Sequence, residues 1–125
     1  MASSKFRSQR KVSGGRYHFF RGKKKSELIG ITANTKLGEK KDVRSRRTPG
    51  GNYKQALLSV KEINVAGKGK TVKTEILNVI ENPANPNLVR RNIITKGAIV
   101  ETKLGKVRVT SRPGQEGSVN GVLVA

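Results

Sequence analysis

The chain has 125 residues, with 27 Lys and Arg against 8 Asp and Glu, and its formal net charge is +19. It contains one histidine and no cysteine, which excludes disulfides and the usual ligand sets of zinc sites. No segment approaches the roughly 18 apolar residues of a membrane span, and the N-terminus lacks the apolar core of a secretion signal. We therefore expect a cytosolic protein whose positive charge is relieved by a polyanionic partner, with nucleic acid as the first hypothesis.

Charge and apolar side chains are divided unequally along the chain. Residues 1–54 hold 16 of the Lys and Arg and all five aromatic residues, but only six Val, Ile or Leu. Residues 55–125 hold 23 Val, Ile or Leu, of which 17 are β-branched. The basic N-terminal end cannot bury enough apolar surface to offset its ordering entropy. We therefore expect residues 1–26 to form an extended, flexible arm and residues 27–125 to form a β-rich body.

The predicted arm interleaves aromatic rings with cations, and its glycines break any helix. This combination suits a segment that neutralises phosphates and stacks on bases. The triple lysine at 23–25 is less specific, because such a run also suits a solubilising or membrane-attracted segment. The RNA contacts predicted in the arm are Arg7, Arg10, Lys11, Arg16, Tyr17, His18, Arg21, Lys23, Lys24 and Lys25.

Residues 28–37 are compatible with one short strand, and residues 38–54 read as a basic, turn-rich loop around Pro49-Gly50-Gly51-Asn52. In this loop guanidinium groups can grip phosphates, Asn52 can bond a base edge, and Tyr53 can stack on a base. The alternative is a solvated basic loop without a ligand. The contacts predicted here are Arg44, Arg46, Arg47, Asn52, Tyr53 and Lys54.

Residues 56–65 and 71–80 are two β-favouring runs that flank the glycine turn at 67–70, which predicts a hairpin. The alternation along the second run places Val72, Thr74, Ile76 and Ile80 on one face.

A loop follows at residues 82–86, where Asn85 can cap one helical turn that begins at Pro86. If Leu88 and Val89 anchor this turn to the core, the cations that follow project from a fixed frame. The contacts predicted for this second basic patch are Arg90, Arg91 and Lys96.

Three more strands are predicted at residues 97–103, 106–111 and 118–124, separated by glycine-containing turns. Short Val- and Ile-rich strands at this spacing favour a small barrel or roll. The fold class is therefore mainly β: a small closed or nearly closed β-barrel or roll with at most one short helix, preceded by the extended basic arm.

The residues needed for catalysis are missing or badly placed. His18 lies in the mobile arm, and the carboxylates are dispersed, so we expect no enzyme, no cofactor and no metal. Glu62 and Glu75 can face each other across the hairpin, but their lysine neighbours favour a salt-bridged surface. Gly69-Lys70-Thr71 resembles the end of a phosphate-binding loop, which leaves a nucleotide-dependent enzyme as an alternative. The strand-like sequence that follows favours a plain hairpin turn.

Five segments of the chain together form a specific combination of motifs. At the N-terminal end they are Ser13-Gly-Gly-Arg16 and the Arg-rich stretch ending in Gly51-Asn-Tyr-Lys54. In the body they are Glu81-Asn-Pro-Ala-Asn85, Val89-Arg-Arg-Asn-Ile-Ile-Thr-Lys-Gly-Ala-Ile-Val-Glu-Thr102 and Val109-Thr-Ser-Arg-Pro-Gly-Gln115. This combination resembles the small-subunit ribosomal protein eight family of archaeal and eukaryotic ribosomes. The short chain is more similar to the archaeal form than to the eukaryotic one.

This resemblance implies a structural, non-catalytic constituent of the small ribosomal subunit in the cytoplasm. Its implied partners are the large ribosomal RNA of that subunit and neighbouring ribosomal proteins, with no membrane and no small-molecule substrate. It also implies a mainly β body with basic extensions that reach into RNA. The alternative is a small basic β-barrel translation factor that binds RNA without being integral to the subunit.

Overall fold

The computed structural model describes residues 8–67 and 69–124. The chain divides into two compact units, Met1–Thr32 and Ala33–Ala125. The arm predicted over residues 1–26 falls within the first unit.

The described part of the first unit has little regular structure. Its only named element is the 3-10 turn η1, Lys25–Glu27. Residues 10 and 16 form an isolated antiparallel bridge, and the Lys11 amide donates to the Gly15 carbonyl at 2.7 Å. Gly14 in this small loop has a φ of +83°, a conformation that glycine adopts without strain. The backbone is therefore held by local turns and not by a core.

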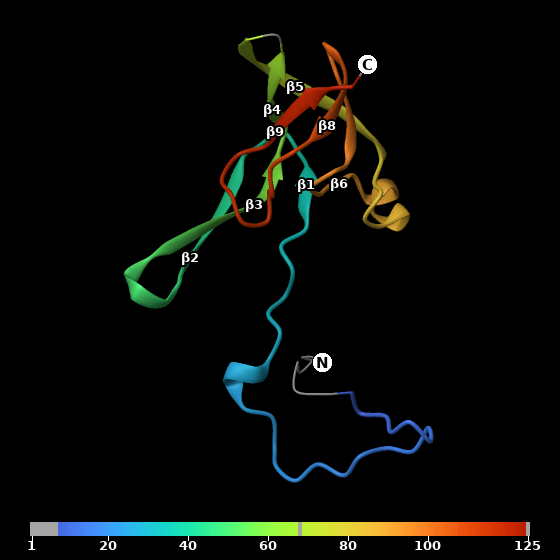
Figure 1. The fold of residues 1–125 in the computed structure, drawn as a ribbon. Helices are drawn as coiled ribbons and strands as arrows, with labels where there is room; N and C mark the ends of the chain where they lie inside the picture. The colour runs from blue at the N-terminus through green and yellow to red at the C-terminus, as the bar shows by residue number, and fades with distance from the viewer. Residues whose placement is uncertain (1–7, 68, 125) are drawn as a thin grey trace. The chain divides into compact units, whose positions relative to one another are not determined.

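The second unit contains all the named strands of the described residues (Figure 1). In chain order its elements are β1 (Thr35–Leu37), β2 (Asp42–Arg47), η2 (Pro49–Gly51), β3 (Tyr53–Val60), β4 (Glu62–Gly67), β5 (Lys70–Glu81), η3 (Pro86–Arg91), β6 (Ile93–Ile94), β7 (Ile99–Thr102), β8 (Gly105–Val109) and β9 (Asn120–Leu123).

Five strands form a closed barrel in the order β4-β5-β7-β8-β9. The parallel pairing of β9 with β4 closes it, with Val65 opposite Gly121. Closure leaves these strands no free edge, which suits a small β domain. The mainly β fold class and the barrel predicted from the sequence are confirmed. The core consists of Leu57, Val60, Ile63, Val65, Ile76, Val79, Ile94, Val100, Val107, Val109 and Val119.

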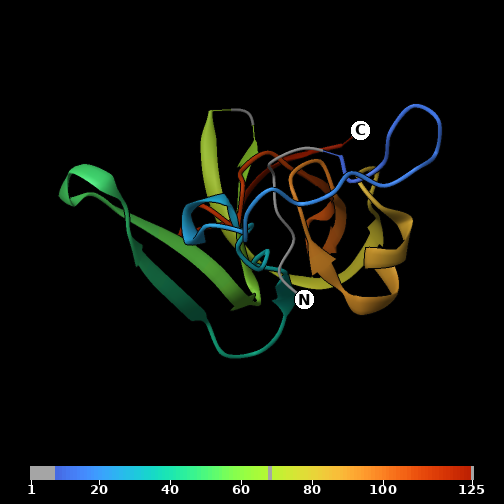
Figure 2. The same ribbon diagram turned by 90° about the horizontal axis from the view of Figure 1, so that it is seen from below.

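A second sheet has the order β2-β3-β1-β6 and contains a region for which a loop was predicted. The prediction of a loop over residues 38–54 is wrong for most of that range. Residues 42–47 form β2, which pairs antiparallel with β3 from the Asp42–Ser59 pair to the Arg47–Tyr53 pair. All six residues of β2 are exposed, so β2 has no alternation of buried and exposed positions that could reveal a strand. We call β2, β3 and the turn between them the ribbon; it extends away from the barrel (Figures 1 and 2).

The hairpin predicted around the glycine turn is present as β4 and β5, with Gly67 paired to Lys70. The alternation predicted along β5 fails near its end. The pairing of β5 with β7 shifts register after Ile76 and again after Val79. These irregularities leave Val79 2% exposed and Ile80 41% exposed. Because Lys70 starts a strand and not a helix, the alternative of a phosphate-binding loop is excluded.

The helical turn predicted at Pro86 is confirmed as η3, in which the Asn85 side chain accepts a hydrogen bond from the Asn87 amide at 3.0 Å. The proline fits the first position because its missing N–H has no partner there in any helix. Across the described ranges the helical elements are short 3-10 turns, and none is a helix long and apolar enough to span a membrane.

Candidate nucleic-acid interface

The ribbon positions the predicted basic loop residues on two neighbouring strands. In its register Arg44 lies opposite Ala56, Arg46 opposite Lys54, and Arg47 opposite Tyr53. Side chains alternate between the two faces of a strand. Arg44, Arg46 and Lys54 therefore share one face. Arg47 and Tyr53 share the other.

The tip of the ribbon is a tight turn that depends on glycine. The Thr48 amide donates to the Asn52 carbonyl at 2.7 Å. Gly50 and Gly51 have φ values of +79° and +74°, in the region that L side chains rarely adopt. The Asn52 side-chain amide donates to the Pro49 carbonyl at 3.4 Å. Asn52 therefore supports the turn with its NH₂ group, and its side-chain oxygen is the atom it presents to a ligand.

The base of the ribbon is fixed to the body by buried contacts. The Thr35 hydroxyl donates to the Leu57 carbonyl at 2.7 Å, and the Leu57 amide donates to the Pro113 carbonyl at 2.9 Å. A Cβ on Gly117 would lie 2.5 Å from Oε1 of Gln55, so this side chain rests against the Gly117 backbone. The cations near the tip are thus presented by a paired, anchored element.

Carboxylates pair with lysines of the barrel instead of neutralising the ribbon. Glu75 contacts Nζ of Lys103 at 2.7 Å and Nζ of Lys61 at 3.8 Å, and Glu62 contacts Nζ of Lys73 at 2.6 Å. The hydrogen bond from Lys103 lowers the pKa of the Glu75 carboxyl. The predicted salt-bridged surface on this hairpin is confirmed. Within residues 8–67 and 69–124, no ion pair involves Arg44, Arg46, Arg47 or Lys54.

The second basic patch lies on η3, where Arg90 and Arg91 are exposed in the last turn. Leu88 and Val89 are half-buried, and the turn ends at Asn92 with a left-handed φ of +49°. In both views η3 lies on the opposite side of the barrel from the ribbon tip (Figures 1 and 2). The two predicted patches of the second unit are therefore separate surfaces.

A buried asparagine holds the η3 loop in place. Asn82 is 1% exposed, and its Oδ1 accepts hydrogen bonds from the Ala84 amide at 3.1 Å and the Thr95 hydroxyl at 2.9 Å. Its Nδ2 donates to the Ile93 carbonyl at 3.4 Å. One side chain thus ties together both ends of the loop that carries Arg90 and Arg91.

Replacing Asn82 by Ala is expected to lower the free energy of unfolding by about 1–3 kcal/mol, because the groups that Asn82 satisfies lose their partner. Urea denaturation followed by circular dichroism measures this loss. Asn87→Ala in the same loop is the matched control, because Asn87 is exposed and its hydrogen bond to Asn85 comes from its backbone amide, which the substitution keeps. Equal stability of the two variants would show that Asn82 does not hold the loop.

Lys96 lines a surface hollow together with Arg108 of β8, a residue that the sequence interpretation missed. Lys106 and Arg108 alternate with the buried Val107 and Val109, so the pattern predicts that both cations point outward. The signal was present in the sequence, but the proximity of Arg108 to Lys96 depends on the tertiary fold.

In the first unit, the predicted aromatic and basic residues of the arm occur together. Phe19 and Phe20 are each 69% exposed, and Tyr17 is also exposed. The ammonium group of Lys11 lies 5.6 Å from the centroid of the Tyr17 ring, and the Arg21 guanidinium lies 5.2 Å from that of Phe20. Rings that carry cations and remain accessible are suited to stacking on bases.

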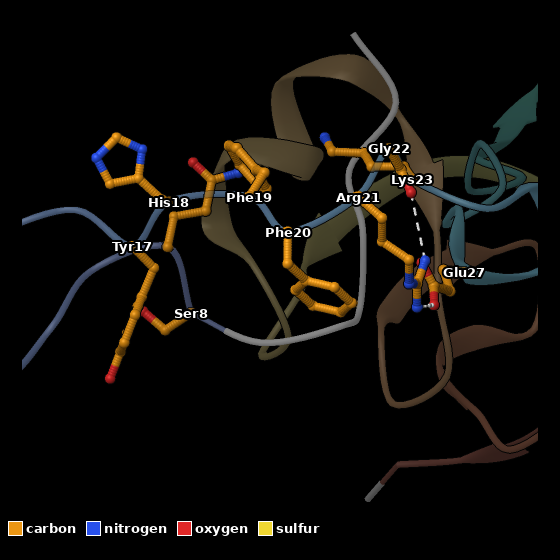
Figure 3. A pocket seen from close by; sticks show the side chains of 10 residues that line it. Ser8, Tyr17, His18, Phe19, Phe20, Arg21, Gly22, Lys23 and Glu27 are labelled. Atoms are coloured by element: carbon orange, nitrogen blue, oxygen red, sulfur yellow. Dashed lines mark hydrogen bonds and ion pairs between the residues drawn. The ribbon is translucent and has the colours of Figure 1, made fainter.

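A recess of about 50 Å³ is lined by Tyr17, Phe19, Phe20 and Arg21, together with His18 and Glu27 (Figure 3). The Tyr17 and Phe20 rings point to one side of the segment, and the His18 ring points to the other. Arg21 is already paired: its Nη1 lies 3.0 Å from Oε2 of Glu27, and its Nη2 lies 2.5 Å from Oε1. This hydrogen bonding lowers the pKa of the Glu27 carboxyl, so the pair stays charged near neutral pH.

Of the other predicted arm residues, all those that the structure describes are exposed. Arg10 donates to the Gly14 carbonyl at 2.8 Å, and Arg16 pairs with Arg10 through the backbone bridge. The turn η1 begins at Lys25, and Lys23 and Lys24 directly precede it. Arg7 lies outside the described residues. No group of three or more His, Asp or Glu within the described chain is placed to hold a metal ion.

Nearly the whole chain is similar to known proteins of one family. The family model of ribosomal protein S8e matches residues 4–124. A small ribosomal subunit protein eS8 of Methanobrevibacter smithii is 50% identical over 126 residues, covering 99% of this chain and 100% of the relative. The eS8 proteins of Methanocorpusculum labreanum and Haloarcula marismortui are 49% and 50% identical over 120 residues, covering 94% of this chain and 95% of each relative. Because both kinds of match span nearly the whole sequence, the chain belongs to the ribosomal protein S8e family.

Proposed function

We propose that this protein is a structural constituent of the small ribosomal subunit that binds ribosomal RNA by phosphate neutralisation and base stacking. Its family consists of ribosomal proteins, which places it in the ribosome and in the cytoplasm. The relatives named above are archaeal, in agreement with the resemblance to the archaeal form. The family is structural and not enzymatic.

One observation carries the RNA-binding part of this proposal. The ribbon holds four exposed cations beside an exposed tyrosine, and none of the four has an ion-pair partner within the described residues. Arg46 and Lys54 lie directly opposite each other, and like charges in that arrangement destabilise a strand pair. A polyanion removes this repulsion. The arrangement is therefore expected in a protein whose folded state is completed by RNA.

The proposed mechanism is docking followed by ordering. The barrel docks against folded RNA through Arg90, Arg91 and Lys96, while the ribbon inserts its tip between RNA segments. Residues 8–26 of the arm are held by local turns in the free protein and become fixed along the RNA, where their rings stack on unpaired bases. Neighbouring ribosomal proteins complete the site.

Binding to a transcript of the small-subunit ribosomal RNA is expected to weaken steeply with salt. If six to ten phosphates are contacted, the affinity falls by about 10³–10⁵-fold between 50 and 200 mM salt. Fluorescence anisotropy of labelled RNA measures this change. An affinity that is independent of salt would contradict the phosphate mechanism.

A high-salt wash of assembled subunits separates an integral constituent from a translation factor. We expect the protein to sediment with the subunit, because a constituent fixed among RNA segments exchanges slowly. Complete release into the supernatant would favour the alternative, a basic β-barrel factor that visits the subunit without being integral to it.

A further inference from the structure

The two faces of the ribbon differ in chemistry as well as in position. One face carries Arg44, Arg46 and Lys54, and the uncharged Ala56 follows them on the side nearer the barrel. The other face carries Arg47 and Tyr53 at its distal end. Because β2 is exposed along its whole length, both faces are open to a ligand at the same time.

The first face is built for phosphate. Arg44 and Arg46 are two residues apart on one strand, and Lys54 is opposite Arg46, so three cations occupy adjacent positions. No carboxylate of the described residues pairs with any of them. Their mutual repulsion acts against the pairing of the two strands. A run of phosphates neutralises the three charges and so removes this repulsion when it binds.

The second face is built for a base. Tyr53 is 69% exposed and has a guanidinium group directly across the strand pair at Arg47. A phenol ring and a planar guanidinium group side by side form a platform on which a nucleobase can stack. Further along the same face, Leu57 is buried against the body. The platform is therefore confined to the part of this face near the tip.

We propose that the ribbon binds RNA through both faces at once, with phosphates on Arg44, Arg46 and Lys54 and a single unpaired base on the Arg47–Tyr53 platform. This inference rests on the proposed function and specifies its ligand as RNA with an unpaired nucleotide beside a backbone segment. The tip turn fixes the register of the two strands, because Gly50 and Gly51 hold conformations that other residues resist.

The two faces are expected to fail in different ways when mutated. Arg44→Thr with Arg46→Thr lowers the slope of log affinity against log salt by about 2, since two phosphate contacts are lost. Tyr53→Ala lowers the affinity by about 5- to 150-fold at every salt concentration and leaves the slope unchanged, because a stacked ring carries no charge. Both are measured by anisotropy with the full chain and a transcript of the small-subunit ribosomal RNA.

A charge reversal separates binding from folding. Arg46→Glu places opposite charges at the pair with Lys54, so the thermal transition is expected to stay unchanged or rise, while the RNA slope falls by at least about 1. The matched control is Lys70→Glu, the same change in charge on the β4–β5 hairpin, away from the ribbon tip (Figure 1). We expect this control to bind RNA nearly as the wild type does.

The stacked base can be observed directly, because the chain contains no tryptophan. Tyr53→Trp introduces a single reporter whose fluorescence is expected to be quenched by RNA with unpaired bases. Inorganic polyphosphate and a fully paired RNA duplex are expected to leave it nearly unchanged. Val72→Trp, at an exposed position on β5, is the control reporter.

The outcomes distinguish the inference from the function on which it rests. If the wild type binds RNA with a steep salt slope but neither ribbon variant changes that binding, the two-faced ribbon is overturned and the proposed function stands. Quenching of the Tyr53→Trp reporter by polyphosphate as strong as by RNA would overturn the base platform. If the wild type itself does not bind RNA, the proposed function fails together with this inference.

Discussion

Gly121→Val is expected to leave the barrel unable to close. A Cβ at this position would lie 2.5 Å from Cγ1 of Val107, 2.9 Å from the Arg108 carbonyl oxygen and 3.1 Å from Cδ1 of Ile63. Gly121 pairs with Val65 of β4 and Val109 of β8, so it sits at the seam that closes the barrel. The carbonyl oxygen belongs to the backbone of β8 and cannot move without breaking that pairing. No cooperative thermal transition is expected for this variant.

Gly121→Ala tests the same clash with a smaller side chain. Overpacking of this kind costs about 1–3 kcal/mol, and each kcal/mol lowers Tm by about 4–8 °C in a domain of this size. Gly67→Ala is the matched control, since Gly67 also lies in a barrel strand but its added Cβ would be 3.8 Å from the nearest atom, the Lys70 carbonyl oxygen. If calorimetry gave the two alanine variants the same Tm, close packing at Gly121 would not be what requires glycine.

The barrel could be predicted from the sequence because its strands carry a local signal. Val107 and Val109 are buried and alternate with Lys106 and Arg108, and glycine turns mark the ends of the strands. The ribbon could not be predicted in this way. β2 is exposed on both faces, so neither its pattern nor its composition distinguishes it from a loop. Its pairing with β3 is stabilised by backbone hydrogen bonds and by the buried contacts that hold Leu57, at the barrel end of the ribbon, to the body.

The chemistry of the candidate interface was visible in the sequence, but its geometry was not. Residue types identified Arg44, Arg46 and Tyr53 as candidates. Only the register shows that the two arginines share one face of the ribbon and that Tyr53 lies on the other. The pair between Arg21 and Glu27 joins residues six apart in an irregular segment, where no periodicity predicts a contact. Register shifts such as that after Val79 likewise arise from tertiary packing, and the order of apolar and polar residues in the sequence does not reveal them.

Deleting residues 1–32 is expected to weaken RNA binding by at least about a thousandfold at 50 mM salt while residues 33–125 still fold. The deleted segment carries nine Lys and Arg and one Glu. If six of these cations contact phosphates, the slope of log affinity against log salt falls by about 5. The barrel and the ribbon remain, because the buried core residues all lie between Leu57 and Val119. Anisotropy measures the binding, and calorimetry is expected to show a Tm within a few degrees of the full chain.

A full-length chain with residues 8–32 in shuffled order is the matched control, because it keeps every charge and ring but changes their sequence. We expect it to recover the salt slope and only part of the affinity. The loop closed by the Arg10–Arg16 bridge and the recess lined by Tyr17 and Phe20 depend on the native order. Full recovery would mean that the arm acts through net charge alone, which contradicts stacking by its rings. A large fall in Tm on deletion would instead make the first unit part of the fold.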